Sequence, residues 1–196
     1  MVVTEEKIRE ALVAPFAADE SIRLHGWTEA DFEKLFLEYY GRIVAVLFRL
    51  TGDKAQAEEL AGDVFWKIYR QPLPADRENN IGGWLYRAAT RVGIDALRAQ
   101  GRRRRYEQAA GEATATVDRE TPLDEVIREE SRRKVRAVLA GMKRAQAQLL
   151  ILRQSGLSYA ELASVCGIKA TSVGTLLARA ESEFERRYRD MFAERK

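Results

Sequence analysis

The sequence has few of the residues that form disulfides, metal sites or membrane spans. It contains one cysteine, Cys166, and one histidine, which excludes an internal disulfide and a site built from several cysteines or histidines. No apolar run approaches the roughly 18 residues of a membrane-spanning helix, and the acidic N-terminus lacks a secretory signal. We therefore expect a cytoplasmic protein without membrane insertion, cofactor or metal.

A large excess of charge of one sign is also missing. The 196 residues carry a formal net charge of +3, and the pI is about 9.0. Such a mild bias indicates a nucleic-acid partner only where basic residues cluster. The apolar share of 46% and the charged share of 32% are typical of a packed, soluble protein.

Apolar residues recur every three or four positions over most of the chain, without convincing strand alternation. The spacing predicts helices over 28–50, 53–70, 84–98, 123–141 and around 149–152. Turn formers predict a loop at 75–83, and an acidic, aperiodic stretch predicts a flexible linker at 106–121.

The predicted fold class is all-α, with two small helical domains joined by a flexible acidic linker. We divide the chain into an N-terminal extension of unknown role (1–27), a first helical domain (28–105), a linker (106–130) and a second domain (131–196). The second domain contains a predicted helix-turn-helix.

The stretch SYAELASVCGIKATSVGTLLARA, residues 158–180, predicts that motif. Ser158 and Glu161 have the spacing of a capping box, Gly167 allows the turn, and Thr171 or Ser172 is expected to cap the second helix. A helix-turn-helix presents the start of its second helix to the DNA major groove. The candidate DNA-binding residues are Lys169, Thr171, Ser172, Thr175 and Arg179. The alternative is a helical packing unit that binds no DNA.

The helix predicted at 84–98 carries arginines on the face opposite its apolar stripe, and GRRRR follows at 101–105. A row of arginines suits the phosphate backbone of a nucleic acid. Amide side chains and an aromatic ring beside that row suit the binding of unstacked, single-stranded bases. The candidate residues are Asn79, Asn80, Trp84, Arg87, Arg91, Arg98, Arg102 and Arg103. The alternative is a solvated basic face followed by a basic linker.

Acidic residues crowd the first half of the helix predicted at 53–70. These residues complement the helix macrodipole, so a purely structural explanation is available. They also form a surface that repels DNA and suits a basic protein partner. The candidate protein-binding residues are Asp53, Glu58, Glu59, Asp63 and Trp66.

Three stretches, in this order, resemble the extracytoplasmic-function group of bacterial sigma factors of the sigma-70 family. FEKLFLEYYGRIVAVLFRLTGDKAQAEELAGDVFWKIYR resembles the first two helices of the group's promoter-melting domain. WLYRAATRVGIDALRAQGRRRR resembles that domain's third main helix. LLILRQSGLSYAELASVCGIKATSVGTLLARAESEF resembles the promoter-reading domain, and the likeness spans roughly residues 28–190 apart from the linker.

The resemblance implies a sigma factor that reads a bipartite promoter. The helix at 53–70 would hold the clamp helices of the largest RNA polymerase subunit. The loop at 76–83 and the helix from Trp84 would open and capture the −10 element, and the helix-turn-helix would read the −35 element. The implied partners are core RNA polymerase, through its clamp helices and flap, and promoter DNA, both duplex and single-stranded. The resemblance is also compatible with restraint by an anti-sigma factor.

Other functional classes remain open from the sequence. A stand-alone transcriptional regulator would use the same helix-turn-helix as a dimer, without core polymerase. A nucleic-acid-processing enzyme is disfavoured, because the chain has neither a glycine-rich phosphate loop nor metal-ligand spacing. A protein-interaction module without DNA contact is disfavoured by the basic helix face.

Overall fold

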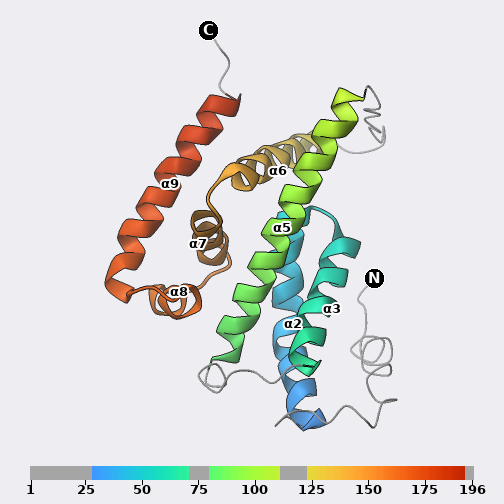
Figure 1. Cartoon of the computed structure of the whole chain (residues 1–196), viewed down its shortest axis with the longest axis vertical. Coiled ribbons are helices and arrows are strands. Elements are labelled where there is room, and N and C mark those ends of the chain that lie inside the picture. Colours follow the sequence, from blue (N-terminus) through green and yellow to red (C-terminus); the bar gives the residue numbers. More distant parts are fainter. Residues whose placement is uncertain (1–27, 71–79, 111–122, 193–196) are drawn as a thin grey trace.

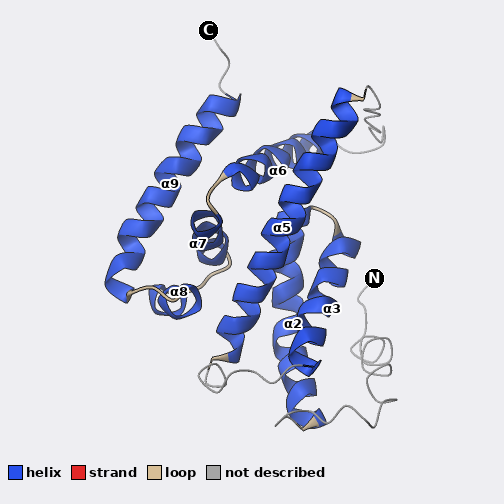
Figure 2. Ribbon diagram, viewed as in Figure 1, coloured by secondary structure: helices blue, strands red, loops and turns tan. Residues whose placement is uncertain are grey.

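The computed structural model describes residues 28–70, 80–110 and 123–192, and in these ranges every regular element is an α-helix (Figures 1 and 2). The predicted all-α class is therefore confirmed. The helices are α2 (Glu29–Thr51), α3 (Lys54–Arg70), α5 (Ile81–Ala109), α6 (Leu123–Gly141), α7 (Arg144–Gln154), α8 (Tyr159–Cys166) and α9 (Ala170–Phe192). No helix of the described ranges is long and apolar enough to cross a membrane. The predicted N-terminal extension lies outside these ranges.

Local capping chemistry fixes both ends of α2. The amide of Asp31 donates to Oγ1 of Thr28 over 3.1 Å, and Oδ2 of Asp31 accepts the Thr28 amide over 3.3 Å. At the other end Gly52 adopts the left-handed conformation, with φ of 71°. Glycine reaches this region without steric cost, so the chain turns there and α3 begins two residues later.

The helix α5 is longer than the predicted 84–98. It begins at Ile81, where the amide of Gly83 donates to Oδ1 of Asn80 over 2.9 Å. It continues through the arginine run to Ala109. Arginine is a good helix former, and the one interruption, Gly101, costs only about 1 kcal/mol relative to alanine. The basic run at 101–105, for which a linker was the alternative, is therefore helical. Parts of the linker expected at 106–130 are helical as well, at the end of α5 and in α6, whose start near residue 123 agrees with the predicted helix.

Two hydrophobic clusters hold the N-terminal and the C-terminal helices together. The first joins α2, α3 and the start of α5, and the second joins α7, α8 and α9. The largest fully buried members are Phe65, Ile43, Leu47 and Leu85 in the first cluster and Leu152, Leu162 and Val173 in the second.

A third cluster connects the N-terminal and the C-terminal helices. It contains Leu50 of α2, Ile94 of α5, Val138 of α6 and Ile151 of α7, together with Met142 between α6 and α7. Because α5 contributes to this cluster along its middle, α6 and α7 pack beside it (Figure 1). The two helical groups that the sequence separates thus share part of a core.

A buried arginine of α6 also lies at the contact between the two helical groups. Arg136 of α6 is 7% exposed and forms an ion pair with Glu129. Its guanidinium covers the turn between α2 and α3, where a Cβ at Gly52 would lie 2.7 Å from Cζ of Arg136. A Cβ at position 52 would displace the guanidinium, which is the flexible end of the Arg136 side chain. Glycine is therefore favoured there mainly by the left-handed backbone conformation.

Candidate nucleic-acid interface

The helix-turn-helix has the predicted local chemistry. The Glu161 amide donates to Oγ of Ser158 over 3.3 Å, and the Ser158 amide donates to Oε2 of Glu161 over 2.7 Å. This confirms the capping box. The hydrogen bonds from Ser158 hold the pKa of Glu161 below its usual value. Gly167 ends α8 in the left-handed conformation, with φ of 67°.

The angle between α8 and α9 is held by apolar side chains. Leu162 and Val165 from α8 pack against Val173 and Leu177 from α9. Cys166 is half-buried beside them, and its burial raises the pKa of the thiol, an effect that the nearby Arg87 partly opposes. The raised pKa disfavours the thiolate, so Cys166 acts here as a packing residue.

The start of α9 differs from the prediction in one respect. The helix begins at Ala170, so Thr171 and Ser172 lie inside its first turn, and neither is the residue that precedes it. The amide of Ser172 instead donates to the carbonyl of Lys169 over 2.9 Å. The expected cap at position 171 or 172 was therefore wrong, because the turn after Gly167 is two to three residues shorter than expected.

The candidate residues of α9 nevertheless come together on the surface. Thr171, Thr175 and Arg179 are exposed and follow one another at intervals of four residues, which places them on one face. Lys169 is exposed beside them, and Ser172 is half-buried. Thr175 and Arg179 also line an open hollow between α7 and α9.

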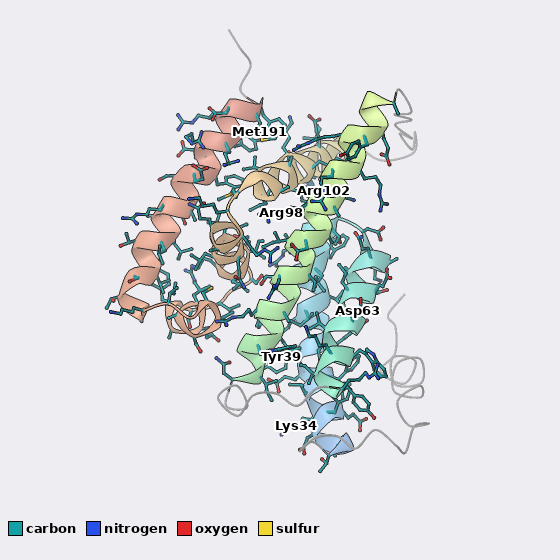
Figure 3. The ribbon with its side chains drawn as sticks, in the orientation of Figure 1. Lys34, Tyr39, Asp63, Arg98, Arg102 and Met191 are labelled. Carbon is teal, nitrogen blue, oxygen red and sulfur yellow. The ribbon has the colours of Figure 1, made fainter. Side chains whose placement is uncertain are left out.

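The arginines of α5 do not form the uniformly exposed row that the sequence predicts. Arg91, Arg102 and Arg103 are exposed, whereas Arg87 and Arg98 are half-buried. Arg98 and Arg102 are labelled on α5 in Figure 3. The reason is that the C-terminal helices cover part of this face. Among the other candidates, Trp84 packs against the first core cluster, Asn80 is exposed, and Asn79 lies outside the described residues.

Arg87 and Arg98 both bind backbone carbonyls at helix ends. Nε of Arg87 donates to the carbonyl of Val165 at the end of α8. Nη2 of Arg98 donates to the carbonyl of Met142 over 2.8 Å, just beyond the end of α6. The last carbonyls of a helix have no partner inside it and carry partial negative charge, so they attract guanidinium groups.

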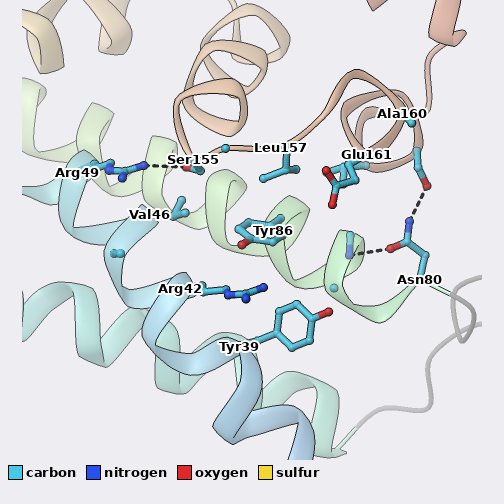
Figure 4. Close-up of a pocket in the computed structure, with 16 residues that line it drawn as sticks. Tyr39, Arg42, Val46, Arg49, Asn80, Tyr86, Ser155, Leu157, Ala160 and Glu161 are labelled. Carbon is cyan, nitrogen blue, oxygen red and sulfur yellow. Dashed lines mark hydrogen bonds between the residues drawn. The ribbon is translucent and has the colours of Figure 1, made fainter.

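A cavity of about 640 Å³ opens between α2, the start of α5, and α8. Tyr39 and Arg42 project from α2 and Tyr86 from α5, and Glu161 of α8 lies across from them (Figure 4). Burial is the main cause of the raised pKa of Tyr39. Tyr39, Arg42 and Tyr86 are absent from the predicted site. The sequence contains only a weak signal for this cavity. Arg42 and Arg49 are seven residues apart, which places them on one face of a helix.

The acidic residues of α3 form an exposed surface away from the arginines of α5. Glu58, Glu59 and Asp63 are exposed along the helix, and Asp63 is labelled on α3 in Figure 3. Asp53 is also exposed, and its Oδ1 accepts the Gln56 amide over 3.2 Å, so it supports the start of α3. Trp66 is half-buried and stacks on Tyr69, with ring centroids 5.8 Å apart.

Comparison with known families identifies two matching models. The model of Sigma-70 region 2 matches residues 35–103, and the model of Sigma-70, region 4 matches residues 132–183. Together they span more than half of the chain. The first covers the helices from α2 to α5, and the second covers those from α6 to α9.

Several characterised proteins are similar over most of this chain. The ECF RNA polymerase sigma factor SigE of Mycolicibacterium smegmatis is 26% identical over 78% of this chain and 60% of its own length. The RNA polymerase sigma factor YlaC of Bacillus subtilis is 29% identical over 80% of this chain and 91% of its own. The RNA polymerase sigma-H factor of Pseudomonas aeruginosa is 26% identical over 83% of this chain and 89% of its own length.

Solved structures are also similar to this chain. One is that of the sigma factor RpoE in complex with the anti-sigma factor NepR from Bartonella quintana. The two chains are 20% identical, with a TM-score of 0.47 and coverage of 84% of this chain and 99% of that one.

Proposed function

The chain belongs to the extracytoplasmic-function group of the sigma-70 family of RNA polymerase sigma factors, and from this we propose that it binds core RNA polymerase and directs promoter-specific initiation of transcription. The observation that carries the proposal is the order of the two matched regions, region 2 before region 4, on two helical groups. The proposed role is not enzymatic. A cytoplasmic location belongs to the same proposal, because the protein must reach polymerase and DNA.

The acidic surface of α3 is the proposed contact with polymerase. Glu59 and Asp63 are exposed one helical turn apart, and their carboxylates suit a basic partner surface. Trp66 lies one turn further along the same helix and offers apolar area next to the charges. Glu58 and Asp53 complete the surface, although Asp53 also stabilises the start of α3.

The start and middle of α5 are the proposed site of −10 capture. Asn80 and Trp84 supply an amide and an aromatic ring, and Arg87, Arg91 and Arg98 supply charge for phosphates. Arg102 and Arg103 extend the basic surface along the exposed end of the helix. Asn79 belongs to the same proposed site.

The exposed face of α9 is the proposed reader of the −35 element. Thr171, Thr175 and Arg179 lie on the solvent side of the second helix of the helix-turn-helix, with Ser172 half-buried among them. Lys169 is exposed directly before this helix. This is the edge that such motifs insert into the major groove. Hydroxyls and a guanidinium there can contact phosphates or base edges.

Size-exclusion chromatography with bacterial core RNA polymerase tests the proposal. The protein is expected to elute as a stoichiometric complex with the polymerase, and a Glu59→Lys/Asp63→Lys variant is expected to bind much more weakly. Glu181→Lys/Glu185→Lys is the matched control, since it makes the same charge change at two exposed positions of α9. If the wild-type protein stayed separate and bound duplex DNA alone as a dimer, a stand-alone regulator would be the better description.

A further inference from the structure

The cavity of about 640 Å³ between α2, the start of α5 and α8 is not explained by the proposed contacts with polymerase or with the −35 element. Small-molecule sites typically have volumes of about 300–1,000 Å³ and combine apolar walls with a few polar groups. This cavity has the same composition. Its apolar walls include Val46 and Leu157, and its aromatic and charged lining residues are Tyr39, Arg42, Arg49, Tyr86 and Glu161 (Figure 4).

Two consecutive glycines at the start of α5 shape one end of this cavity. A Cβ at Gly82 would stand 2.6 Å from the hydroxyl oxygen of Tyr39. A Cβ at Gly83 would stand 2.6 Å from Oδ1 of Asn80. Side chains at these two positions would therefore displace Tyr39 and Asn80. Because the glycines have none, both neighbours lie against the first turn of α5 and form an end wall of the cavity.

The two tyrosines of the lining are held in place by the core. Tyr86 packs against all three hydrophobic clusters, and Tyr39 packs against the first. Both are only half-buried, so each leaves part of its side chain open to the cavity. Aromatic rings that are fixed beforehand can bind a planar ring with little loss of conformational entropy.

Two exposed arginines bring positive charge to the same cavity. Within the part of the chain that the structure describes, the hydrogen bonds and ring contacts of both guanidiniums are with neutral groups. Nη1 of Arg49 donates to the Gln154 carbonyl over 3.2 Å and to Oγ of Ser155 over 3.1 Å. The guanidinium of Arg42 lies 5.9 Å from the centroid of the Tyr39 ring. Neither arginine is neutralised by an ion pair in the described ranges, so both can attract an anion.

The acidic residues near the cavity do not cancel this charge. Glu161 lines the cavity, but its Oε2 accepts the amide and the hydroxyl of Ser158 over 2.7 and 2.6 Å, within the capping box of α8. Glu38 contacts Tyr39, although it is not part of the lining. Two guanidiniums therefore face one carboxylate that is already engaged, and the lining favours an anionic ligand.

We propose that this cavity binds a free nucleoside monophosphate, with its phosphate on Arg42 and Arg49 and its base against Tyr86 and Tyr39. A phosphate offers three acceptor oxygens, which two guanidiniums can share. A nucleobase supplies the planar ring that the tyrosines suit. The proposal goes beyond the proposed function, because these four residues belong to neither the polymerase contacts nor the DNA contacts described above.

Isothermal titration calorimetry of the full chain tests this proposal. The probes are the 5′-monophosphates of adenosine, guanosine, cytidine and uridine. At least one of them is expected to bind as one molecule per chain. The matching nucleoside alone and inorganic phosphate alone are each expected to bind at least about ten-fold more weakly, because each makes only part of the contacts. Binding of none of the four nucleotides, or equal binding of inorganic phosphate, would overturn the proposal.

Substitutions on α2 then locate the bound nucleotide. Arg42→Ala is expected to weaken nucleotide binding at least about ten-fold, because it removes a phosphate contact. Lys34→Ala is the matched control, since it removes one positive charge from an exposed position of the same helix outside the cavity (Figure 3). It is expected to change the affinity less than about two-fold, because an exposed charge outside the site is screened by solvent and salt. Equal effects of the two substitutions would show that binding responds only to overall charge, and would overturn the site.

A second variant fills the cavity without changing its charge. Ala45 is exposed and lines the cavity, so Ala45→Phe places a ring in the proposed site from a position that the core does not use. Nucleotide binding is expected to be lost, and binding of a labelled single strand of mixed sequence is expected to stay as in the wild-type protein. Unchanged nucleotide binding would place the ligand elsewhere and overturn the proposal.

The single strand also separates a free ligand from a nucleotide within DNA. If Ala45→Phe weakened binding of the strand while none of the four nucleotides bound the wild-type protein, the cavity would belong to the DNA site, and the proposal of a separate ligand would be overturned. Co-elution with core polymerase is measured on its own, so failure of the proposed function is distinguishable from failure of this inference.

Discussion

Gly93 of α5 lies directly against Leu50 of α2: a Cβ at position 93 would stand 2.5 Å from Cδ1 of that leucine. It would also stand 3.1 Å from Cδ2 of Leu47. Both leucines are fully buried, so neither can move into solvent. The close approach of α2 and α5 therefore depends on the absence of a side chain at position 93. The proposed −10 site lies on the same helix α5.

We predict that Gly93→Ala lowers the free energy of unfolding by about 1–2 kcal/mol, since overpacking outweighs the better helix propensity of alanine. Gly41→Ala is the control, because an added Cβ at this exposed position in α2 meets nothing within 4 Å. It should raise the free energy of unfolding by about 0.5–1 kcal/mol. Urea unfolding followed by circular dichroism measures both. Stabilisation by both substitutions would mean that α2 and α5 are further apart than described.

Glu183 of α9 gives a prediction about pH. Hydrogen bonds from Arg186 and Arg187 lower its pKa from 4.5 to about 2. Because the pKa is lower in the folded protein, the interaction stabilises the fold fully above about pH 5, and this contribution disappears as the pH falls towards 2. The free energies of unfolding of the wild-type protein and of Glu183→Gln should therefore differ at pH 6 and converge near pH 2. Carboxyl NMR titration gives the pKa independently, and a value near 4.5 would contradict the arrangement.

Helix ends that carry local signals were predictable from the sequence, and those without them were not. Ser158 is the cap and Gly167 the left-handed turn residue that the sequence indicated. The end of α5 was predicted too early because a run of arginines contains no helix-stopping signal. The arginine-bearing face of α5 was also predictable from the 3.6-residue period, since that period depends on local geometry alone.

What covers that face was not predictable. The carbonyls that bind Arg87 belong to residues 77 and 78 positions away in the chain. Those that bind Arg98 are 42 and 44 positions away. Periodicity states which way a side chain points from its helix, but it says nothing about which distant helix end lies opposite. The cavity between α2, α5 and α8 escaped prediction for the same reason.

Ser158 should matter more than its exposed position suggests. The helix α8 has 8 residues, so its first turn is a large share of it, and the capping box satisfies backbone donors there. We predict that Ser158→Ala lowers the free energy of unfolding by about 1 kcal/mol and weakens duplex binding as α8 frays. Ser182→Ala is the control, because the Ser182 hydroxyl donates to the Ala178 carbonyl over 2.9 Å within α9 and caps nothing. Equal effects of the two substitutions would show that the capping box contributes little.

Arg179 provides the sharpest test of the proposed duplex-reading face. It is exposed on the face of α9 that carries Thr171 and Thr175. If it binds a phosphate, Arg179→Ala should weaken binding to all duplexes alike and reduce the slope of log K against log salt by about one. If it binds a base edge, the loss should instead be about 1–3 kcal/mol on preferred sequences and small on others.

Arg189→Ala is the matched control for this measurement. Arg189 lies near the other end of α9, where its Nη2 is 3.7 Å from Oε1 of Glu185. The Arg189→Ala substitution removes the same charge from the same helix as Arg179→Ala. A change in net charge alone would therefore affect both variants equally. A larger effect of Arg179→Ala would therefore locate the DNA at the start of α9, next to the turn at Gly167. Equal effects would mean that the duplex responds only to the overall charge of the helix, and the proposed −35 reader would have to be sought on another face.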